Sequence, residues 1–469
     1  MKGVTTMKKL VKKIIAVSLC FILMLSIGVT AFAGADENDT ELDYVITSPY
    51  DGVDWDNWKQ YKASLHSHTD ASDGGQSIEE NVKSHYDLGF QILAITDHAV
   101  VGKQWNEVPD MVPLYRLFKF ERTGMRDPVI LTDEEREQIV AGTYESEARK
   151  ELEKQLGYEL GGMMEVTGGC EANGATPIND CHINTFNTDF GRARMGIYGD
   201  FETVVENCEK DGGYSFLDHT GEYVGRWVED EWRAYEPFYA NKFANIFLKY
   251  DSCVAFDVNS TRYDSVIWDQ ILKLTIPKGR NVPGIAFSDS HQMGDDNDWA
   301  FTMMLMPELT MEAYEECMWS GAWFNVGRVD TLYLGDDFNG TGNLPPAVSR
   351  IDVDNEEDTI SFTGSEFDNV QWISEGKIIA EGKGLTSIDL DDYKDELGCY
   401  IRFQITGPGG ILYSQPFTTM AEGVEYESTV YKTFDTAMIF RAFADIFDAT
   451  IGRSFIGVIL KRVLWNHIW

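Results

Sequence analysis

The chain has 469 residues, which predicts two domains with additional segments, and 43% of its residues are hydrophobic, enough for a substantial core. Its 77 acidic and 39 basic residues give a formal net charge of −38. A surface of this sign repels long polyanions, so we do not expect duplex DNA or RNA as a partner. A small-molecule substrate, phosphorylated or neutral, is compatible with this charge if bound metal ions supply positive charge locally.

The first 33 residues have the pattern of a secretory signal peptide. The basic start contains Lys2, Lys8, Lys9, Lys12 and Lys13. An apolar run follows over Ile14–Val29, and Ala31-Phe32-Ala33 forms a small-residue cleavage site before Gly34. Because the apolar run is short for a membrane span, we predict cleavage after Ala33 and a secreted or cell-surface protein. The alternative is an uncleaved membrane anchor.

Six cysteines follow the leader: Cys170, Cys181, Cys208, Cys253, Cys317 and Cys399. An even count in an exported protein is compatible with disulfides. Buried thiols are an equal alternative, because a chain of this length does not need covalent cross-links. No CxxC spacing occurs, so the sequence gives no support for a cysteine zinc site.

Residues 34–56 are acidic and turn-rich, and we interpret them as a linker. Beyond them, short apolar runs at 61–65 and 91–95 have the length of buried strands and flank a helical pattern at 77–88. That pattern begins with Ser77 and has a glutamate three positions later, which is a capping box. The alternation of strand and helix favours a parallel α/β barrel.

Two longer segments interrupt this alternation. Residues 99–165 are long for a connection and largely helical over 131–157, so we predict an inserted cap. The alternative is an ordinary outer helix with long flanking loops. Residues 220–250 are rich in aromatic side chains, with Arg226 and Arg233 interleaved. This composition is typical of a packed amphipathic helix, and a substrate-facing lid is the alternative.

The C-terminal third has a different residue pattern. Residues 335–346 have the composition of a linker. Short alternating runs with glycine-rich turns over 345–420 predict a β-sandwich-like domain, in which we find no catalytic constellation. Residues 421–469 predict an amphipathic tail whose last stretch, 451–469, has three basic residues and no acidic one. We consider both packing against the sandwich and contact with an anionic membrane surface.

Six of the eight histidines accompany acidic residues at the ends of apolar runs. His66 and His68 share one side of an extended strand, because alternate residues of a strand face the same way, so both can hold one ion. Asp73 follows in the next loop and can turn back toward a neighbouring ion. Imidazole nitrogens and carboxylates suit zinc, manganese or iron. This segment therefore predicts metal ligands.

The same context recurs along the chain. Asp97 and His98 end a buried run, where a charged carboxylate is costly unless it is paired or bound to metal. Glu171 follows two glycines, and a carboxylate there can bridge two ions. The remaining candidates are His182, His219, Asp289 and His291. Because each cluster follows an apolar run and precedes a polar turn, we expect strands to deliver them to one common mouth.

In these motifs the chain resembles the PHP superfamily, the polymerase and histidinol phosphatase domain. The family pattern is HxHTxxSDG, then TDH, a glutamate followed at a distance by a histidine, a later histidine, and a closing DxH. Its metal positions stand here as His66, His68, Asp73, His98, Glu171, His182, His219, Asp289 and His291. The resemblance covers residues 57–334. It is weaker at His219, where the family often has His-Pro and this chain has His219-Thr220.

The resemblance implies a distorted (β/α)7 barrel, a site for two to three divalent metal ions (Zn, Mn or Fe), and hydrolysis of phosphate esters. We therefore predict a secreted phosphoesterase that acts on a small phosphate ester through metal-activated water. The leader and the appended β-domain of this chain are similar to those of exported members of a branch that also includes carbamate-ester hydrolases. A metal-dependent amide, carbamate or carboxyl-ester hydrolase is thus the first alternative. The second is a non-enzymatic surface protein with a structural metal site.

Two further roles are predicted around the metals. Asp97 and His219 are candidates for proton transfer, and orientation of neighbouring groups is the alternative for both. Arg226, Arg233 and Arg262 are candidates for binding an anionic group of the substrate. The alternative for each arginine is an ordinary surface cation.

Overall fold

The computed structural model describes residues 42–176, 179–194, 200–222, 225–228, 231–234, 236–260, 264–329, 333–335, 337–421 and 423–432, and the single positions 446, 450 and 454. The chain divides into two units, Met1–Leu42 and Asp43–Trp469, and every helix and strand given below belongs to the second unit. The predicted leader, Arg262 and most of the predicted tail lie outside the described residues.

The described strands form four sheets. In the first sheet, neighbouring strands follow the order β1 (Tyr44–Thr47), β21 (Phe417–Ala421), β19 (Tyr400–Gly407), β20 (Gly410–Tyr413), β13 (Trp323–Gly327), β12 (Ala300–Met306), β2 (Lys59–Ser64), β3 (Ile92–Ala94) and β4 (Met164–Val166). Two further strands extend this sheet beside β19: β16 (Asn369–Ser374) pairs with β19, and β17 (Lys377–Gly382) pairs with β16. The second has β11 (Gly284–Ile285), β10 (Cys253–Asp257), β7 (Tyr214–Leu217), β6 (Asn179–Phe186) and β5 (Cys170–Thr176). The third has β14 (Ala347–Asp354), β15 (Thr359–Ser365) and β18 (Ser387–Asp389), and the fourth has β8 (Gly225–Val228) and β9 (Glu231–Ala234).

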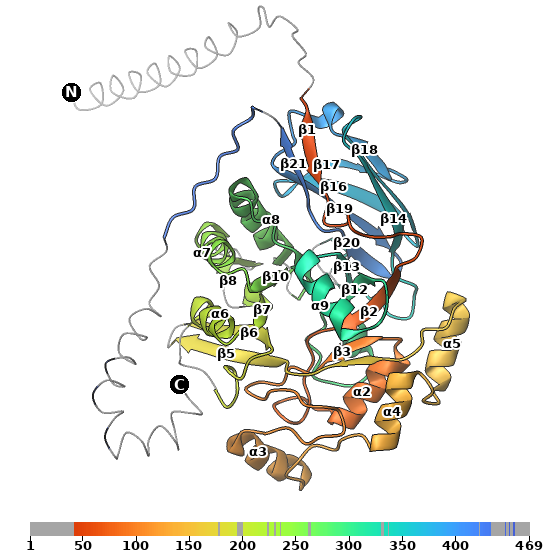
Figure 1. Ribbon diagram of the computed structural model, residues 1–469, viewed down its shortest axis with the longest axis vertical. Helices are drawn as coiled ribbons and strands as arrows, with labels where there is room; N and C mark the ends of the chain where they lie inside the picture. Colours follow the sequence, from red (N-terminus) through yellow and green to blue (C-terminus); the bar gives the residue numbers. More distant parts are fainter. Residues whose placement is uncertain are drawn as a thin grey trace, which may run out of the picture. The chain divides into compact units, whose positions relative to one another are not determined.

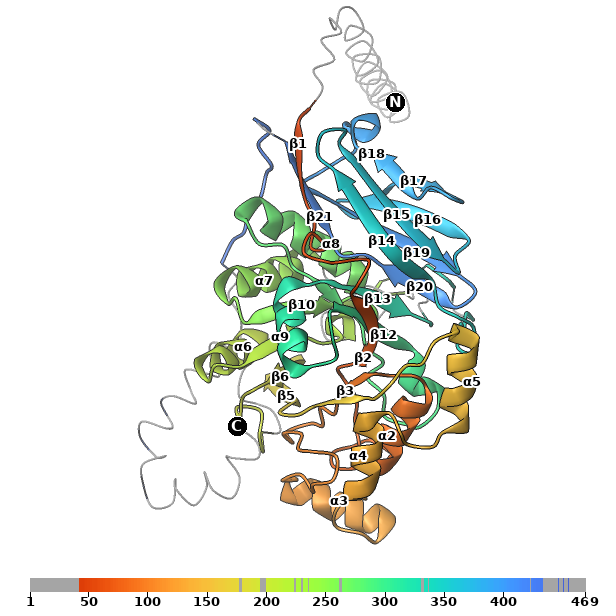
Figure 2. The same cartoon turned by 45° about the vertical axis from the view of Figure 1, so that its right-hand side comes forward.

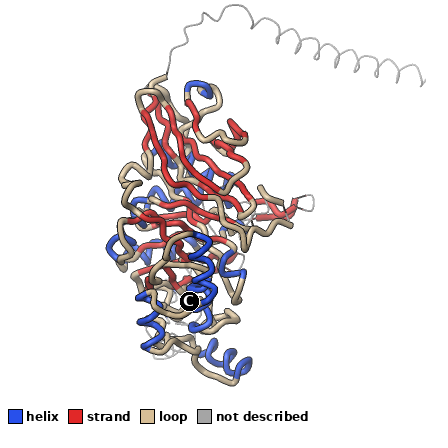
Figure 3. The backbone as a smooth tube through the Cα atoms, turned by 90° about the vertical axis from the view of Figure 1, so that its right-hand side faces the viewer, coloured by secondary structure: helices blue, strands red, loops and turns tan. Residues whose placement is uncertain are grey.

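Eight α-helices lie in the described residues: α2 (Ile78–Asp87), α3 (Pro113–Thr123), α4 (Asp133–Ala141), α5 (Glu147–Leu156), α6 (Phe201–Lys210), α7 (Glu236–Lys249), α8 (Asp264–Thr275) and α9 (Met311–Ser320). Figures 1 and 2 show α6, α7 and α8 side by side along the second sheet. In Figure 3, strands dominate the end of the molecule that holds β14 to β19, and helices gather toward the other end. None of the described helices has the length and apolar character that a membrane span requires.

The sequence pattern explains the first strand–helix–strand unit. β2, α2 and β3 fall on the predicted segments 61–65, 77–88 and 91–95. The Ser77 hydroxyl accepts a hydrogen bond from the Glu80 backbone N–H (3.2 Å), and the Glu80 carboxylate accepts one from the Ser77 N–H (2.8 Å). The predicted capping box is therefore confirmed. On its inner side α2 buries Val82 and Tyr86 against the core.

The α/β class is confirmed, but the sheets are mixed rather than purely parallel. β2, β3 and β4 are parallel, as are β7, β10 and β11, whereas β6 is antiparallel to both β5 and β7. Two isolated parallel bridges, Ser67 to Ser290 and His98 to Glu171, link the two large sheets. A closed barrel ladder is not formed by the described strands, because these contacts are single bridges and not continuous strand pairs.

The segment predicted as a linker, 34–56, contains β1 in its described part. Tyr44 and Ile46 are buried while Val45 is exposed, which is the alternation of a strand with one face on the core. β1 pairs antiparallel with β21, more than 370 positions away along the chain. The strand that pairs with β1 is distant in the sequence, so four alternating residues alone did not reveal a strand. The linker interpretation is wrong for these four residues.

Residues 347–421 form the predicted β-rich region. Phe362 of β15 stacks on Phe403 of β19 at 4.3 Å between ring centroids, and Trp372 of β16 meets Phe403 at 5.2 Å. Two sheets thus face each other across aromatic side chains, as in a sandwich. However, β20 pairs with β13 of the α/β part, so the two parts share one sheet. The predicted domain boundaries stay a prediction.

The two interrupting segments fold as follows. Residues 99–165 contain α3, α4 and α5, and Thr132 caps α4 with Glu135 in a second capping box. Residues 220–250 contain the hairpin β8–β9 and helix α7, in which Phe243 and Phe247 are fully buried. For α7 the packed-helix interpretation is confirmed. Arg226 and Arg233 stand opposite each other in the register of the hairpin.

Candidate metal centre

All nine predicted metal ligands lie together at the ends of neighbouring strands. His66 and His68 follow β2, Asp73 lies in the loop before α2, His98 follows β3, Glu171 and His182 lie in β5 and β6, His219 follows β7, and Asp289 and His291 follow β11. The backbones between them are bonded directly: the His68 N–H donates to the Ser290 carbonyl (2.9 Å) and the Glu171 N–H to the Thr96 carbonyl (3.0 Å). The expected common mouth is therefore present.

The nine side chains form three groups in which one ligand atom from each residue lies within 4.8 Å of the others. The first group joins His66, Glu171, His219 and Asp289. His66 Nε2 is 3.0 Å from Asp289 Oδ1, and His219 Nε2 is 3.1 Å from Glu171 Oε1. Two imidazoles and two carboxylates in this arrangement match the donor set of a divalent metal site.

The second group places His98 and His182 around Glu171. His182 Nδ1 lies 2.7 Å from Glu171 Oε1, and His98 Nδ1 lies 3.1 Å from Glu171 Oε2. Glu171 therefore belongs to two groups and presents an oxygen to each of these histidines. That Glu171 bridges two ions stays a prediction.

The third group holds His68, Asp73, His98 and His291. Asp73 is its centre: Oδ1 lies 3.7 Å from His68 Nδ1 and 3.6 Å from His291 Nε2, and Oδ2 lies 3.5 Å from His98 Nε2. The Asp73 side chain is 50% exposed and that of His291 is 36% exposed, so the centre is open on this side.

His66 and His68 fall in different groups, although the sequence predicted that they share an ion. Their ring centroids are only 5.0 Å apart, and His68 Nε2 lies 2.9 Å from Glu171 Oε2 and 3.1 Å from Asp289 Oδ1. His68 thus faces the same carboxylates as His66 through one nitrogen and faces Asp73 through the other. A shared ion stays a prediction.

Hydrogen bonds satisfy the buried ligand atoms only in part. In the described part of the chain, five buried ligand atoms make no hydrogen bond: His66 Nε2, His68 Nε2, His98 Nδ1, Glu171 Oε2 and Asp289 Oδ1. Buried polar atoms without a partner are costly, unless a bound group satisfies them. Each of these three nitrogens lies 2.9–3.8 Å from one or both of these two carboxylate oxygens. The His, Asp and Glu clusters therefore fit a metal site.

Burial and mutual charge set the protonation of the ligands. Burial lowers the pKa of His98 to about 3, so its imidazole is neutral, the form that coordinates metals. Burial raises the pKa of Glu171, but electrostatic interactions with the surrounding imidazoles outweigh it and bring the pKa well below its ordinary value. The same balance lowers the pKa of Asp289. Both carboxylates are therefore anionic at neutral pH.

Backbone strain coincides with two ligands. His219 has a φ of 25° and Asp289 a φ of 49°, in the left-handed region that residues other than glycine seldom adopt. Such conformations cost free energy and persist where the surroundings fix them, which is common at functional sites. At His219 the backbone N–H donates to Asp257 Oδ2 at 3.0 Å, which helps to hold this turn.

Asp97 holds the loop that carries the ligands. Its carboxylate accepts hydrogen bonds from the Thr69 N–H (2.7 Å), the Thr69 hydroxyl (2.6 Å) and the Ser72 hydroxyl (2.6 Å). Thr69 and Ser72 stand between His68 and Asp73, so these bonds fix the position of both ligands. Of the two roles predicted for Asp97, this geometry favours orientation over proton transfer.

Sequence reasoning missed several supporting residues. Thr96 Oγ1 lies 2.8 Å from His66 Nδ1, and Asn173 Nδ2 lies 3.2 Å from His182 Nε2, so each fixes the orientation of an imidazole ring. Asp257 supports His219, and Asp218 is a buried carboxylate beside it. Asp257 ends the apolar strand β10, so the signal that identified the ligands, an acid at the end of an apolar run, was also present there.

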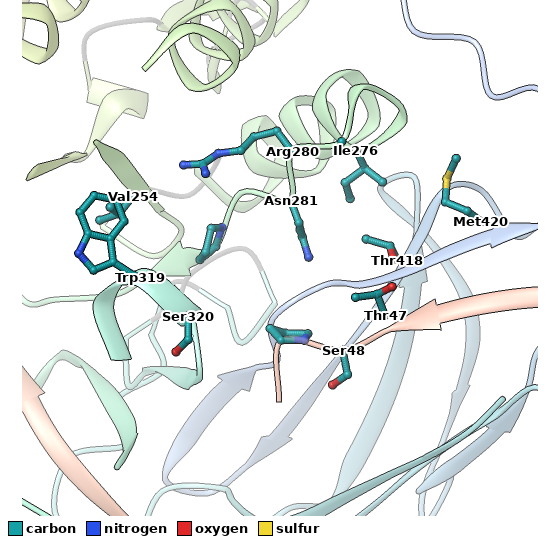
Figure 4. Close-up of a pocket in the computed structure, with 13 residues that line it drawn as sticks. Thr47, Ser48, Val254, Ile276, Arg280, Asn281, Trp319, Ser320, Thr418 and Met420 are labelled. Atoms are coloured by element: carbon teal, nitrogen blue, oxygen red, sulfur yellow. The ribbon is translucent and has the colours of Figure 1, made fainter. Parts of the chain in front are cut away.

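A cavity of about 440 Å³ lies elsewhere, between β1 and β21 on one side and α9 and residues 276–283 on the other. Figure 4 shows Arg280, Asn281 and Trp319 among the side chains around it. None of the thirteen residues that line it is a predicted ligand. The metal centre and this cavity are therefore separate features. Arg226 and Arg233, the predicted substrate-binding residues with a described backbone position, also do not line it.

A search of protein-family models finds no match, and neither does a search of curated proteins. Among solved structures, the chain is similar to a two-domain protein from Bacteroides vulgatus that contains a predicted PHP-like metal-dependent phosphoesterase. The identity is 14% and the TM-score 0.37, over 83% of this chain and 100% of that chain. This likeness is distant, so the case for a metal centre rests on the nine clustered side chains. They stand at the positions that the motif resemblance to the PHP superfamily predicts.

Proposed function

We propose that this chain is a metal-dependent hydrolase that cleaves a small phosphate ester. The observation that carries the proposal is the joining of three ligand groups through shared residues: Glu171 belongs to two groups and so does His98. A structural zinc site is typically closed by four ligands, whereas neighbouring ions with shared surroundings are typical of hydrolytic centres. The half-exposed Asp73 leaves such a centre accessible.

The donor set supports two to three divalent ions. It consists of imidazole nitrogens and carboxylate oxygens without a thiolate, which suits Zn, Mn or Fe. When bound, such ions lower the pKa of water and offset negative charge on a phosphoryl oxygen. The anionic Glu171 and Asp289 hold the ligand histidines in position and would balance the positive charge of the ions.

The roles of the two proposed proton-transfer residues differ. We assign Asp97 to orientation, because three hydrogen bonds from Thr69 and Ser72 occupy its carboxylate. His219 stays the candidate for proton transfer in addition to its place in the first ligand group. Arg226, Arg233 and Arg262 remain proposed for the anionic group of the substrate, on the strength of the sequence alone.

We further propose that the ligand-bearing strands form a distorted (β/α)7 barrel in solution. Support comes from the bridges between Ser67 and Ser290 and between His98 and Glu171, and from α6, α7 and α8 along β6, β7 and β10. A secreted or cell-surface location is proposed from the leader pattern, and membrane-surface contact from the basic, apolar tail.

Two chromogenic substrates test the reaction class. Purified full-length protein loaded with Mn²⁺ is assayed with p-nitrophenyl phosphate and with p-nitrophenyl acetate. We expect hydrolysis of the phosphate ester and little of the acetate. Hydrolysis of the acetate alone would favour the carboxyl-ester or carbamate alternative. Protein that holds metal and turns over neither substrate, nor any member of a wider phosphoester panel, would contradict the proposal and favour a structural metal site.

A further inference from the structure

Helix α3, in the insertion before Glu171, buries a polar side chain in place of an apolar face. Lys119 is 1% exposed, whereas Leu114, Leu117 and Phe118 are 42%, 52% and 52% exposed. A surface helix ordinarily turns its apolar stripe to the core. The inverted arrangement means that polar contacts, and not apolar packing, hold α3 in place.

Those polar contacts lead to the loop that carries two metal ligands. The Lys119 ammonium pairs with the Asp70 carboxylate, two positions after His68, and both side chains are buried. The Arg122 guanidinium donates a hydrogen bond to the Gly74 carbonyl at 3.0 Å, next to Asp73. α3 is therefore fixed on the loop from His68 to Asp73 at both ends of that loop.

Tyr115 lies on the face of α3 that meets this loop. It precedes Lys119 by four positions, and residues at this spacing share one side of a helix. Burial raises the pKa of Tyr115, and the negative charges of Asp73, Asp97 and Glu171 raise it further. The Tyr115 hydroxyl therefore stays protonated at neutral pH and can donate a hydrogen bond.

The Tyr115 hydroxyl is not used by the fold. Among the residues that the structure describes it has no hydrogen-bond partner, and the side chain is partly exposed. A hydroxyl on the face of α3 that meets the loop of His68 and Asp73, and that bonds to no described residue, is a donor with an open position. An oxyanion seated at the metal centre would fill that position, because it carries the acceptor that the hydroxyl lacks.

We propose that Tyr115 contacts the substrate: its hydroxyl donates a hydrogen bond to an oxygen of the phosphoryl group bound at the metal centre, and the Lys119–Asp70 pair sets the position of α3. This inference rests on the proposed function. It assigns part of the 99–165 insertion to the site and gives the centre a neutral donor beside its ligands.

The test compares Tyr115→Phe with Tyr158→Phe in full-length protein loaded with Mn²⁺. Tyr158 belongs to the same insertion, is 55% exposed and lies beyond α5, so its substitution controls for loss of a phenolic hydroxyl. Calorimetry measures the dissociation constant of inorganic phosphate, and the turnover of p-nitrophenyl phosphate is measured in parallel. We expect Tyr115→Phe to weaken phosphate binding about tenfold or more, as for a lost hydrogen bond to a charged group, at unchanged metal content and melting temperature. Tyr158→Phe should match wild type.

Three results would contradict the role of Tyr115, the proposed function, or both. Phosphate binding by Tyr115→Phe equal to that of wild type, at equal Mn²⁺ content, would overturn the inference. Wild-type protein that binds no phosphate would overturn the inference and the proposed function together. Wild-type protein that binds phosphate but hydrolyses no phosphate ester would contradict the proposed function alone, and the two dissociation constants would still decide the role of Tyr115.

Discussion

Glu171 belongs to two of the three ligand groups: its Oε1 lies 3.1 Å from His219 Nε2 of the first group and 2.7 Å from His182 Nδ1 of the second. It is fully buried, so its charge is offset by the surrounding imidazoles and not by water. Its chemistry could be predicted from the sequence, because an acid after two glycines stood in the same context as the histidines. Its pairing with His98 across a backbone bridge could not, because bridges between distant segments leave no local pattern.

Replacing Glu171 with Gln keeps the side-chain volume and removes the negative charge. We expect metal content to fall and turnover to drop by at least about 100-fold, as for the loss of a key metal-site group. Elemental analysis and p-nitrophenyl phosphate kinetics measure both. The matched control is Glu147→Gln, because the Glu147 side chain is 94% exposed at the start of α5. Glu171→Gln as active as Glu147→Gln, at equal metal content, would contradict the role of Glu171.

His85 lies outside the ligand groups and gives a prediction for pH dependence. Burial lowers its pKa from 6.5 to about 4, so the unfolded chain binds a proton that the folded chain rejects. Its contribution to stability is therefore present above pH 6.5 and is lost as the pH falls toward 4. Between pH 7 and pH 5 we expect it to lower the free energy of unfolding by about 2 kcal/mol.

Urea unfolding in the presence of a chelator measures this effect in wild type and in His85→Gln. The loss of stability from pH 7 to pH 5 should be about 2 kcal/mol smaller in the variant. Equal losses in both proteins would show that His85 does not titrate as its burial requires.

At the scale of single elements, local signals predicted β2, α2, β3 and α4, because β2 and β3 fall on short apolar runs and α2 and α4 begin at capping boxes. β1 escaped prediction because four alternating residues become a strand only when β21 is available to pair with them. Helix α3 shows a different limit. Its apolar residues face solvent, so a reading of amphipathic pattern would assign the wrong face to the core.

The buried pair Lys119–Asp70 predicts a local effect in α3. Lys119→Met leaves the Asp70 carboxylate buried without its cation, which should cost about 3–5 kcal/mol in the stability of this element. Asp70→Asn combined with Lys119→Met should recover most of it, because no charge is then left uncompensated. Hydrogen exchange of residues 113–123 reports the opening of α3. Exchange in Lys119→Met that equals wild type would mean that the pair does not hold the helix.

At the scale of the whole molecule, the β-rich region and the α/β part are joined by more than a linker. β20 extends the sheet at β13, and Arg402 of β19 forms two hydrogen bonds to Asp269 of α8 at 2.8 and 2.7 Å. Both side chains are buried, and the Tyr400 hydroxyl also donates to Asp269 at 2.8 Å. These contacts favour cooperative folding over the separately folding domain predicted for 345–420. Truncation after Arg328 would remove β20 from β13 and leave Asp269 unpaired.

Replacing Arg402 with Met should therefore destabilise the protein as one unit, by about 3–5 kcal/mol, because the buried Asp269 loses its partner. Lys383→Met is the control, since the Lys383–Asp368 pair is largely exposed and should contribute less than about 1 kcal/mol. Urea unfolding followed by tryptophan fluorescence and by circular dichroism measures the change. Two separate transitions, of which only one shifts in Arg402→Met, would instead support an independent β-domain.

Metal binding by nine residues from six separate stretches of the chain is the central claim, and the number of bound ions tests it most directly. Native mass spectrometry of the full-length protein, prepared without chelators and supplied with Mn²⁺ or Zn²⁺, gives that number. Three ligand groups that share Glu171 and His98 predict two to three ions per chain. A folded chain whose mass shows no bound ion would contradict the claim.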